Sequence, residues 1–319
     1  MNLSTIIQRI KKSKHLLIST HENADPDAVC SELALAHYLK LLKKKFQIIN
    51  NEAVPQRFRF IPGTEQIRPF HPGINVDADT VIVVDCGEKD RIGNVAALLP
   101  QDALVINIDH HITNDNFGDL NYVDPKASST AEILYALFKQ ARCRLDQRLA
   151  LYLYLGMMTD TGCFRYENTT ARTHQIVSDL LRFGLPVSKL YGRLYETIPL
   201  NDLKAFVKIV GDFEIYDGGK VACVELPKDV LCQFSADFDL RDTIFKFLRA
   251  IKGMEVLVIF TEVSSQKTRI NFRSTNRVNV AHLAHFFQGG GHRRASGCLY
   301  PASLKESKPR VLAKIKELL

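Results

Sequence analysis

The order of hydrophobic and polar positions divides the chain into two parts. In the first part, short apolar runs with many β-branched residues alternate with longer helix-like segments, and such runs are typical of buried parallel strands. The expected strands are residues 15–20, 46–50, 80–85 and 104–109. The expected helices are residues 28–45, 91–99, 129–141, 146–159 and 170–183. This order predicts an α/β fold with a doubly wound, mainly parallel sheet and helices on both faces.

The pattern changes after Pro186. Residues 187–210 have helical periodicity and no strand-like run, so we expect a helical linker there. Between residues 211 and 319, Asp217-Gly-Gly219 separates two strand-like runs and predicts a hairpin. Further strands are expected at residues 255–263 and 268–273, and helices at residues 239–251, 279–287 and 303–318. The sequence therefore predicts a first domain at residues 1–186 and a second, smaller α+β domain at residues 211–319.

Composition limits the class of protein and its compartment. The 319 residues are 46% hydrophobic, which suits one large or two ordinary domains. The net charge of +7 is compatible with a lysine-rich surface or with an anionic substrate and does not choose between them. The seven cysteines form no CxxC pair, which favours a reducing cytoplasm over a disulfide framework. We expect no membrane span, and the apolar residues at the N-terminus precede the basic ones, the wrong order for a signal peptide.

Carboxylates and imidazoles follow three of the apolar runs and one apolar helix. They are His21, Asp25 and Asp27 after the first run, Asp85 after the run at 80–84, Asp109, His110 and His111 after the run at 103–108, and Asp160 after the helical run at 149–156. In an open α/β sheet, ligands bind beyond the carboxyl ends of the strands. We therefore expect these side chains to converge in one crevice.

Their chemistry suits a pair of divalent metal ions. The candidate ligands are His21, Asp25, Asp27, Asp85, His110 and Asp160. Four carboxylates balance two divalent cations, and a mixed set of histidines and carboxylates suits Mn²⁺ or Fe²⁺ better than Ca²⁺, with Mg²⁺ and Zn²⁺ also compatible. Two such ions ~3.5–4 Å apart can clamp the oxygens of a phosphoryl group during in-line displacement. A single Asp at a strand end is more often a helix cap, but four such sites in order favour the metal hypothesis.

This arrangement resembles the DHH family of phosphoesterases over nearly the whole chain. Asp109-His110-His111 matches the motif that names the family, and the segment from His21 to Asp27 is similar to the family's first motif. The spacing of Phe117–Pro125 and Ser128–Glu132 is similar to the cytosolic nanoRNase and pAp-phosphatase branch. The resemblance implies one metal on His21, Asp25 and Asp85, a second on Asp27, Asp85, His110 and Asp160, and Asp109 and His111 as catalytic residues, with His111 on the substrate phosphate.

The first motif differs from the family's usual pattern at two positions. Pro26 stands where the family has glycine between the two acids, and Cys30 stands where it has glycine before Ser31. Proline fixes its own φ and restricts the preceding residue, here Asp25, to extended conformations. All ligand types are nevertheless retained.

A glycine run near the C-terminus has an anion-binding composition. Gly289-Gly-Gly291 is followed by His292 and two arginines, and backbone N–H groups of glycines can wrap an anion. On its own, three glycines also form an ordinary flexible turn. The run resembles the signature of the DHH-associated C-terminal domain. That resemblance implies substrate binding by Arg273, Ser274, Gly289, Gly290, Gly291, His292 and Arg293.

Together these observations predict a cytoplasmic, two-metal phosphoesterase that uses two Mn²⁺ ions, or Mg²⁺ or another divalent metal in their place. The expected substrates are very short oligoribonucleotides, cut to mononucleotides, and 3′-phosphoadenosine 5′-phosphate (pAp). The alternatives are a phosphodiesterase for linear or cyclic dinucleotides, a family II inorganic pyrophosphatase and a catalytically inactive nucleic-acid-binding protein. The sequence is compatible with a homodimer and predicts no membrane partner.

Overall fold

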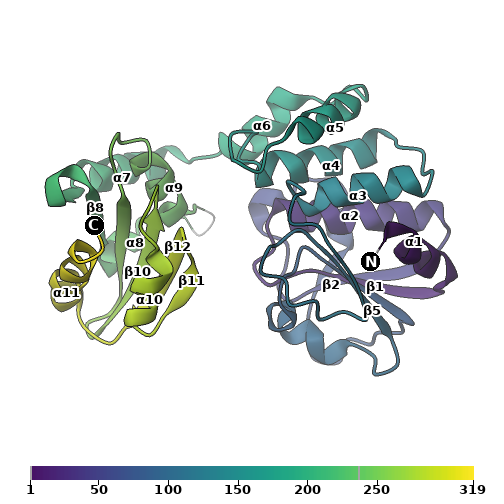
Figure 1. The fold of residues 1–319 in the computed structure, drawn as a ribbon, viewed down its shortest axis with the longest axis horizontal. Coiled ribbons are helices and arrows are strands. Elements are labelled where there is room, and N and C mark those ends of the chain that lie inside the picture. The colour runs from purple at the N-terminus through teal and green to yellow at the C-terminus, as the bar shows by residue number, and fades with distance from the viewer. Residues whose placement is uncertain (1, 236–237) are drawn as a thin grey trace. The chain divides into compact units, whose positions relative to one another are not determined.

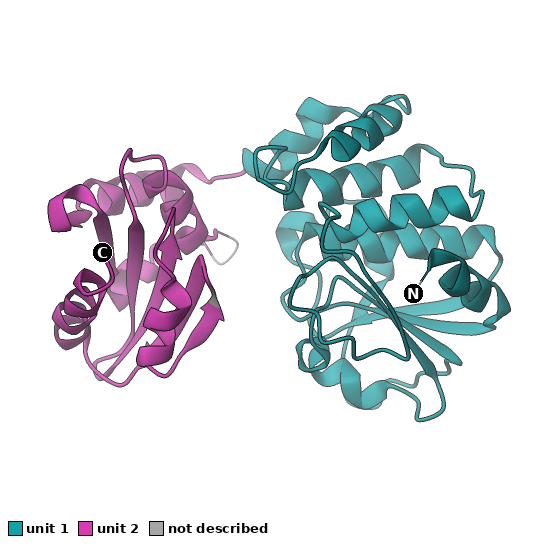
Figure 2. Cartoon of the chain, viewed as in Figure 1, with its two compact units in different colours: residues 1–196 teal, residues 197–319 magenta. Residues whose placement is uncertain are grey.

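The computed structural model describes residues 2–235 and 238–319, and the side chain of His292 lies outside the described part. The chain forms two compact units that meet in sequence between Glu196 and Thr197 (Figure 2). This boundary divides the segment expected to be a helical linker, because α6 (Val187–Tyr195) belongs to the first unit and α7 (Leu200–Gly211) to the second.

The first unit is built on an all-parallel sheet of six strands (Figure 1). In spatial order the strands are β3 (Ile67–Pro69), β2 (Lys45–Asn50), β1 (His15–Ser19), β4 (Thr80–Val84), β5 (Leu104–Asp109) and β6 (Leu120–Val123). The chain order runs in opposite directions on either side of the β1–β4 pair, which is the point where ligands bind in doubly wound sheets. The predicted parallel α/β sheet is thereby confirmed, and β3 and β6 are strands that the sequence pattern did not indicate.

The two faces of this sheet are covered differently. One face packs on helices and forms the larger core of the unit, which includes Leu16, Ile18 and Ile82. In this core α2 (Pro26–Leu41) and α3 (Thr130–Gln140) contact the strands, and α4 (Gln147–Asp160) packs on these two helices. The core is completed by α1 (Leu3–Lys12), which contacts α3, and by α5 (Ala171–Leu181), which contacts α4 and α3. The other face, with Leu17 and Val83, packs on loops and on η3 (Lys89–Leu98).

The regular helix expected at residues 91–99 is therefore wrong. The segment η3 is a 3₁₀ helix that is interrupted at Gly93, where φ is 65° and ψ is −144°. A residue with these angles cannot continue a right-handed helix, and the interruption divides the segment into two short turns.

The second unit has a mixed six-stranded sheet. In spatial order its strands are β11 (Gly290–His292), β12 (Ala295–Tyr300), β10 (Lys267–Ser274), β9 (Val256–Ser264), β8 (Val221–Leu226) and β7 (Glu214–Tyr216). The hairpin expected around Asp217–Gly219 is confirmed, because β7 and β8 pair in antiparallel register on either side of the short η4 turn. The glycine run is not an open loop, because β11 pairs with β12.

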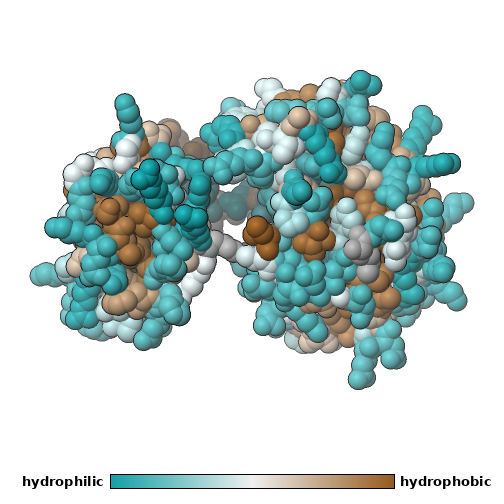
Figure 3. All heavy atoms as spheres, viewed as in Figure 1, coloured by the Kyte–Doolittle hydropathy of each residue, from teal (hydrophilic) through white to brown (hydrophobic). Residues whose placement is uncertain are grey.

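Helices cover both faces of the second sheet. One face, with Ile270 and Phe272, packs on α10 (Val280–Phe286) and α11 (Leu304–Lys316). The other face, with Leu257 and Ile259, packs on α7 and α9 (Leu240–Leu248). The short helix α8 (Lys228–Leu231) contacts β9. Hydrophilic side chains dominate the visible surface of each unit (Figure 3). Among the described residues, none of the helices is both long and apolar enough to cross a membrane.

Candidate metal and active site

The residues expected to bind metal come together at the carboxyl ends of β1, β4 and β5. Three groups have ligand atoms that all lie within 4.8 Å of one another. The groups are His21 with Asp25 and Asp85, Asp27 with His110 and Asp160, and Asp85 with His110 and His111. Asp85 belongs to two of these clusters, and His110 also belongs to two. The cluster with His21 and the cluster with His111 therefore share the Asp85 carboxylate, and the cluster with Asp27 and Asp160 adjoins them through His110.

The shared carboxylate of Asp85 presents one oxygen to each cluster. Its Oδ2 lies 3.8 Å from Nε2 of His21, and its Oδ1 lies 3.6 Å from Nε2 of His110. The hydroxyl of Thr130 donates to Oδ1 at 2.9 Å and fixes the carboxylate plane. The backbone of Asp85 has φ of 55°, a left-handed conformation that turns the chain sharply after β4.

Asp27 is held by the beginning of α3. Its two oxygens accept hydrogen bonds from the backbone N–H groups of Thr130 and Ala131, at 2.7 and 3.1 Å. The positive end of the helix thus stabilises a carboxylate that is fully buried. On α4, Gly156 leaves the space that Asp27 occupies, since a Cβ at this position would lie 2.4 Å from Oδ1 of Asp27.

Asp25 is positioned by the proline that follows it. The residue has φ of −90° and ψ of −179°, the extended conformation that Pro26 imposes. One oxygen of Asp25 accepts from the N–H of Ala28 at 3.0 Å, so Asp25 is the N-cap of α2 and Pro26 is its first residue. The capping explanation and the metal hypothesis are compatible, because the second oxygen remains available to the cluster with His21 and Asp85.

Two groups hold the ring of His21 on its Nδ1 side. Its Nδ1 lies 2.7 Å from the carbonyl oxygen of Glu22 and 3.3 Å from the guanidinium of Arg91. Its Nε2 lies on the side of the cluster where Asp85 lies, 3.8 Å from Oδ2 of that residue. A backbone carbonyl behind a histidine is a common way to orient a metal ligand.

The paired histidines are held differently. The Nε2 of His110 lies 3.1 Å from Oδ2 of Asp160 and 3.6 Å from Oδ1 of Asp85. The Nδ1 of His111 instead forms a 2.7 Å bond to Asp109, whose second oxygen accepts from the side chain of Asn114 at 2.6 Å. Asp109 is not in any of the three groups, and its contacts show that it orients His111.

The buried charges shift the pKa values of the site strongly. Burial would lower the pKa of His110, but Asp160 and Asp85 raise it to about 10. Burial likewise opposes the charged form of His21, and the hydrogen bond and field of Asp85 raise its pKa to about 9. Burial and the neighbouring carboxylates raise the pKa of Asp25 to about 6 and that of Asp27 well above its usual range.

These shifts test whether the residues present fit divalent cations. Burial and repulsion between carboxylates raise the pKa values of Asp25, Asp27 and Asp160, whereas the neighbouring histidines lower the pKa of Asp85 to about 2. The charged form of the histidines is favoured because the cluster has more negative charge than its surroundings neutralise. Divalent cations at the same positions would supply the positive charge that the protons supply here. The donor set of histidine nitrogens and carboxylate oxygens fits Mn²⁺, Fe²⁺, Mg²⁺ or Zn²⁺.

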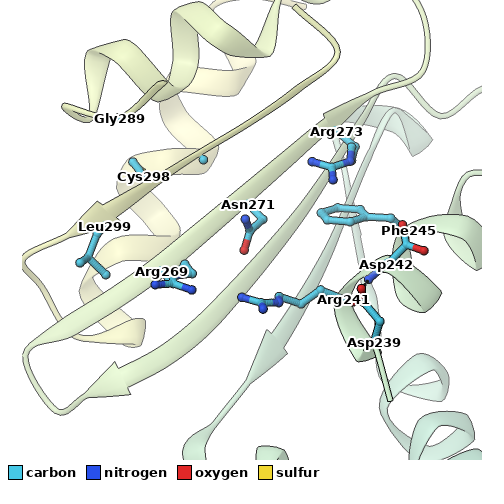
Figure 4. A pocket seen from close by; sticks show the side chains of 11 residues that line it. Asp239, Arg241, Asp242, Phe245, Arg269, Asn271, Arg273, Gly289, Cys298 and Leu299 are labelled. Carbon is cyan, nitrogen blue, oxygen red and sulfur yellow. Dashed lines mark hydrogen bonds between the residues drawn. The ribbon is translucent and has the colours of Figure 1, made fainter. Parts of the chain in front are cut away.

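The expected substrate-binding residues of the second unit are distributed over two faces of its sheet. Arg273 and Gly289 line a pocket on the face of α9 (Figure 4). Ser274 is buried and, one position along β10, points to the opposite face. Gly290, Gly291 and Arg293 are not among the residues that line this pocket. The side chain of His292, which was also predicted to bind substrate, lies outside the described residues.

Sequence reasoning missed several residues that support the site. Thr130 and Ala131 hold Asp85 and Asp27, and Asn114 holds Asp109. The guanidinium of Arg91 lies 3.3 Å from Nδ1 of His21. The capping signal at Ser129-Thr130 could have indicated that α3 begins at the site, whereas Arg91 follows no motif in the single sequence.

Comparison with protein families identifies the class. Residues 15–157 match the DHH family N-terminal domain, and residues 218–319 match the DHHA1 domain. The chain is 30% identical to a curated relative over 95% of its own length and 90% of the relative's length. The chain therefore belongs to the DHH family.

Individual relatives show which members of the DHH family this chain is similar to. The relative just mentioned is the bifunctional oligoribonuclease and PAP phosphatase NrnA of Thermus thermophilus. The protein with the same name from Bacillus subtilis is 31% identical over 92% of this chain and 91% of the relative. A solved exopolyphosphatase-related protein from Bacteroides fragilis has a TM-score of 0.90 at 24% identity, with 99% of this chain and 96% of that chain covered, and shows the same fold.

Proposed function

We propose that this chain is a Mn²⁺-dependent phosphoesterase that hydrolyses very short oligoribonucleotides to mononucleotides and removes the 3′-phosphate of pAp. The observation that carries the proposal is the set of three adjoining ligand clusters, which are linked through Asp85 and His110. Support also comes from the relatives of Thermus thermophilus and Bacillus subtilis, whose names state both activities. We further propose a cytoplasmic location, as the cysteine content favours.

In this proposal, six residues hold two metal ions. One ion is bound by His21, Asp25 and Asp85, and the other by Asp27, Asp85, His110 and Asp160. When bound, the two ions polarise the phosphoryl group and lower the pKa of an attacking water. The carboxylate of Asp85 spans both positions because its two oxygens face the two histidines, at 3.8 and 3.6 Å.

His111 is the proposed phosphate contact. Its Nδ1 is engaged by Asp109 at 2.7 Å, which leaves Nε2 directed away from that carboxylate. The hydrogen bond to Asp109 raises the pKa of His111 and so favours the charged ring, which can donate from Nε2 to a phosphate oxygen. Asp109 is then a positioning residue whose own pKa is lowered chiefly through its contact with His111, in spite of burial.

The second unit is the proposed nucleotide-binding part. Arg273 lines its pocket, and the guanidinium can form charge-assisted hydrogen bonds with a phosphate. We propose that the glycine run contributes backbone N–H groups and that His292 and Arg293 add positive charge. This division of roles predicts that the second unit controls substrate affinity and the first unit controls bond cleavage.

A substrate panel tests the proposed function. Purified protein is assayed with a diribonucleotide, a 5-mer, a 24-mer, pAp, a cyclic dinucleotide and inorganic pyrophosphate, each with Mn²⁺ and with Mg²⁺. We expect the diribonucleotide and pAp to be hydrolysed fastest with Mn²⁺ and the 24-mer slowest. Preferred hydrolysis of the cyclic dinucleotide or of pyrophosphate would replace the proposal with the corresponding alternative, and no hydrolysis with bound metal would indicate an inactive binding protein.

A further inference from the structure

The pocket of the second unit contains arginines that the proposed roles of Arg273 and the glycine run do not use. The pocket has a volume of about 610 Å³. Arg269, Asn271 and Arg273 alternate along β10, so their side chains stand on one face of the sheet. Arg241 reaches the same pocket from α9 (Figure 4).

The pocket exists because the helices on this face leave part of the sheet uncovered. The core under α7 and α9 is formed with residues of β8 and β9 and includes no residue of β10 or β12. Over the uncovered strip, Gly289 and Gly297 line the pocket without side chains. A Cβ on Gly289 would lie 2.2 Å from the carbonyl oxygen of Gly297, so the two backbones pack in direct contact and form a smooth floor.

The carboxylates that line the pocket already have partners. Asp242 pairs with Lys246 at 2.6 Å, and Asp239 accepts from the N–H of Asp242 at 3.1 Å as the N-cap of α9. In contrast, neither Arg241 nor Arg269 has a hydrogen-bond or ion-pair partner in the part of the chain that the structure describes. Two guanidinium groups are thus left to bind an anion in a concave site.

Arg273 is a third and more rigid cation in this pocket. Its guanidinium lies over the ring of Phe245, 4.8 Å from the ring centroid, and donates to the carbonyl of Phe272 at 3.2 Å. Stacking on an aromatic ring fixes the plane of the guanidinium and leaves its other edge for a ligand. Arg273 therefore has a fixed direction, whereas Arg241 and Arg269 are exposed side chains that can close on a ligand.

We propose that Arg241 and Arg269 bind the 5′-terminal phosphate of the substrate and make the enzyme selective for 5′-phosphorylated ribonucleotides. A terminal phosphate monoester carries nearly two negative charges at neutral pH, since its second pKa is about 6, whereas a phosphodiester carries one. Two guanidinium groups match the terminal group. This inference rests on the proposed function. It adds the 5′-terminal phosphate as the group by which the enzyme recognises its substrate.

Both proposed reactions have a substrate with a 5′-phosphate, which is the group that this assignment requires. Water and pAp give AMP and inorganic phosphate, and water and the dinucleotide pApA give two AMP. In both reactions the bond between phosphorus and the 3′-oxygen breaks, the hydroxyl of water joins phosphorus, and a proton goes to the 3′-oxygen. In both, the nucleotide that keeps this oxygen carries a 5′-phosphate, so one phosphate pocket serves both substrates.

Steady-state kinetics of the full-length enzyme tests this assignment. The kcat/KM values of pApA and ApA are measured with wild type, Arg241→Gln, Arg269→Gln and the double variant. We expect wild type to favour pApA by about ten- to a hundredfold, as expected for charge-assisted contacts with phosphate. The ratio should fall toward one in the double variant, mainly through KM. Arg249→Gln, which changes an exposed arginine at the end of α9 that does not line the pocket, should keep the wild-type ratio.

Binding of 5′-AMP in EDTA gives a second readout that does not depend on catalysis. We expect the dissociation constant to rise about tenfold or more in the double variant and to be unchanged in Arg249→Gln. A wild-type pApA/ApA ratio near one, or equal 5′-AMP binding by wild type and double variant, overturns the 5′-phosphate assignment while leaving the proposed function intact. Absence of hydrolysis of pApA, ApA and pAp by metal-loaded protein would refute the proposed function, and the assignment would fail with it.

Discussion

The two units of this protein arrange charge in opposite ways. In the first unit, Asp27 and Asp85 are buried and are fixed by backbone N–H groups, a threonine hydroxyl and histidines. In the second unit, Arg269 on β10 and Arg241 on α9 line an open pocket and have no hydrogen-bond or ion-pair partners among the described residues. The first arrangement suits small cations that replace the missing positive charge, and the second suits an anionic group of a larger, exchangeable ligand.

Because of this difference, we expect mutations in the two units to have different effects. A buried carboxylate that bridges two clusters cannot be removed without changing both, because each of its oxygens has its own neighbours. An exposed guanidinium contributes one contact among several, so its loss weakens binding and leaves the bond-breaking groups in place. Mutations in the first unit should therefore change metal content and kcat, and mutations in the second should change KM.

The largest effect is expected for Asp85→Asn. We expect loss of both metal ions and a decrease in turnover of ~10³-fold or more, since an amide is a poor bridge between two cations. The fold should survive, because asparagine tolerates the left-handed φ of 55° and removal of a buried charge relieves repulsion. Metal analysis and the thermal midpoint in EDTA check both points. Two Mn²⁺ per chain with a near-normal rate would contradict the bridging role.

The next largest effects distinguish the roles of His110 and His111. His110→Ala should reduce metal occupancy, because Nε2 of His110 lies near both Asp85 and Asp160. His111→Ala should keep the metals and lose rate by about 10²–10³-fold, the usual consequence of removing one group that stabilises developing charge. Asp109→Asn is the companion variant, since it should reproduce part of the His111 defect without metal loss. Equal metal loss in the two histidine variants would show that the assignment is wrong.

The strands and the metal-ligand set could be predicted because they depend on local and regular features. A buried parallel strand has an apolar run, and its carboxyl end lies where ligands bind, so His21, Asp85 and His110 could be brought together without coordinates. The supporting residues could not be predicted, because their contacts join distant parts of the chain. Thr130 reaches Asp85, 45 positions away, and its N–H reaches Asp27, 103 positions away.

In the second unit the sequence was less informative for a related reason. The glycine run has the composition of a loop, but Gly290 and Gly291 pair with β12 through backbone hydrogen bonds that have no signature in side chains. The pocket depends on which strip of the sheet the helices leave uncovered, a property of packing rather than of periodicity. The alternation of Arg269, Asn271 and Arg273 indicated a polar face of β10 and did not indicate that α9 would add Arg241.

A smaller effect is expected for Arg273→Ala. Losing this contact should lower kcat/KM for pAp and for a dinucleotide by about ten- to a hundredfold, mainly through KM, with two metals per chain retained. The small ester bis-p-nitrophenyl phosphate has no nucleotide for the second unit to bind, so the ratio of nucleotide to ester hydrolysis should fall by the same factor. His292→Ala is expected to behave similarly. A parallel loss of both reactions would end the proposed division of roles between the units.

The smallest effect concerns a buried carboxyl of the first unit that is outside the metal-ligand set. Glu32 on α2 is buried and accepts from Asn50 at 2.9 Å, and burial, only partly offset by Asn50 and His21, raises its pKa to about 8. Because the folded-state pKa lies above the ordinary value of 4.5, the contribution of Glu32 to stability is fully present below that value. It is lost as the pH rises through 8.

Glu32→Gln should therefore gain stability relative to wild type as the pH rises from 5 to 8.5. Glutamine keeps an oxygen for Asn50 and cannot ionise, so the difference in thermal midpoint between variant and wild type, measured in EDTA, should grow by about 2–4 °C for each kcal/mol involved. Glu65→Gln, an exposed position of the same unit, should show no such trend. A difference that stays constant between pH 5 and 8.5 would mean that Glu32 ionises as readily as a surface carboxyl. Burial would then not favour the protonated form of Glu32, and this carboxyl would behave like the solvated charges of the second unit.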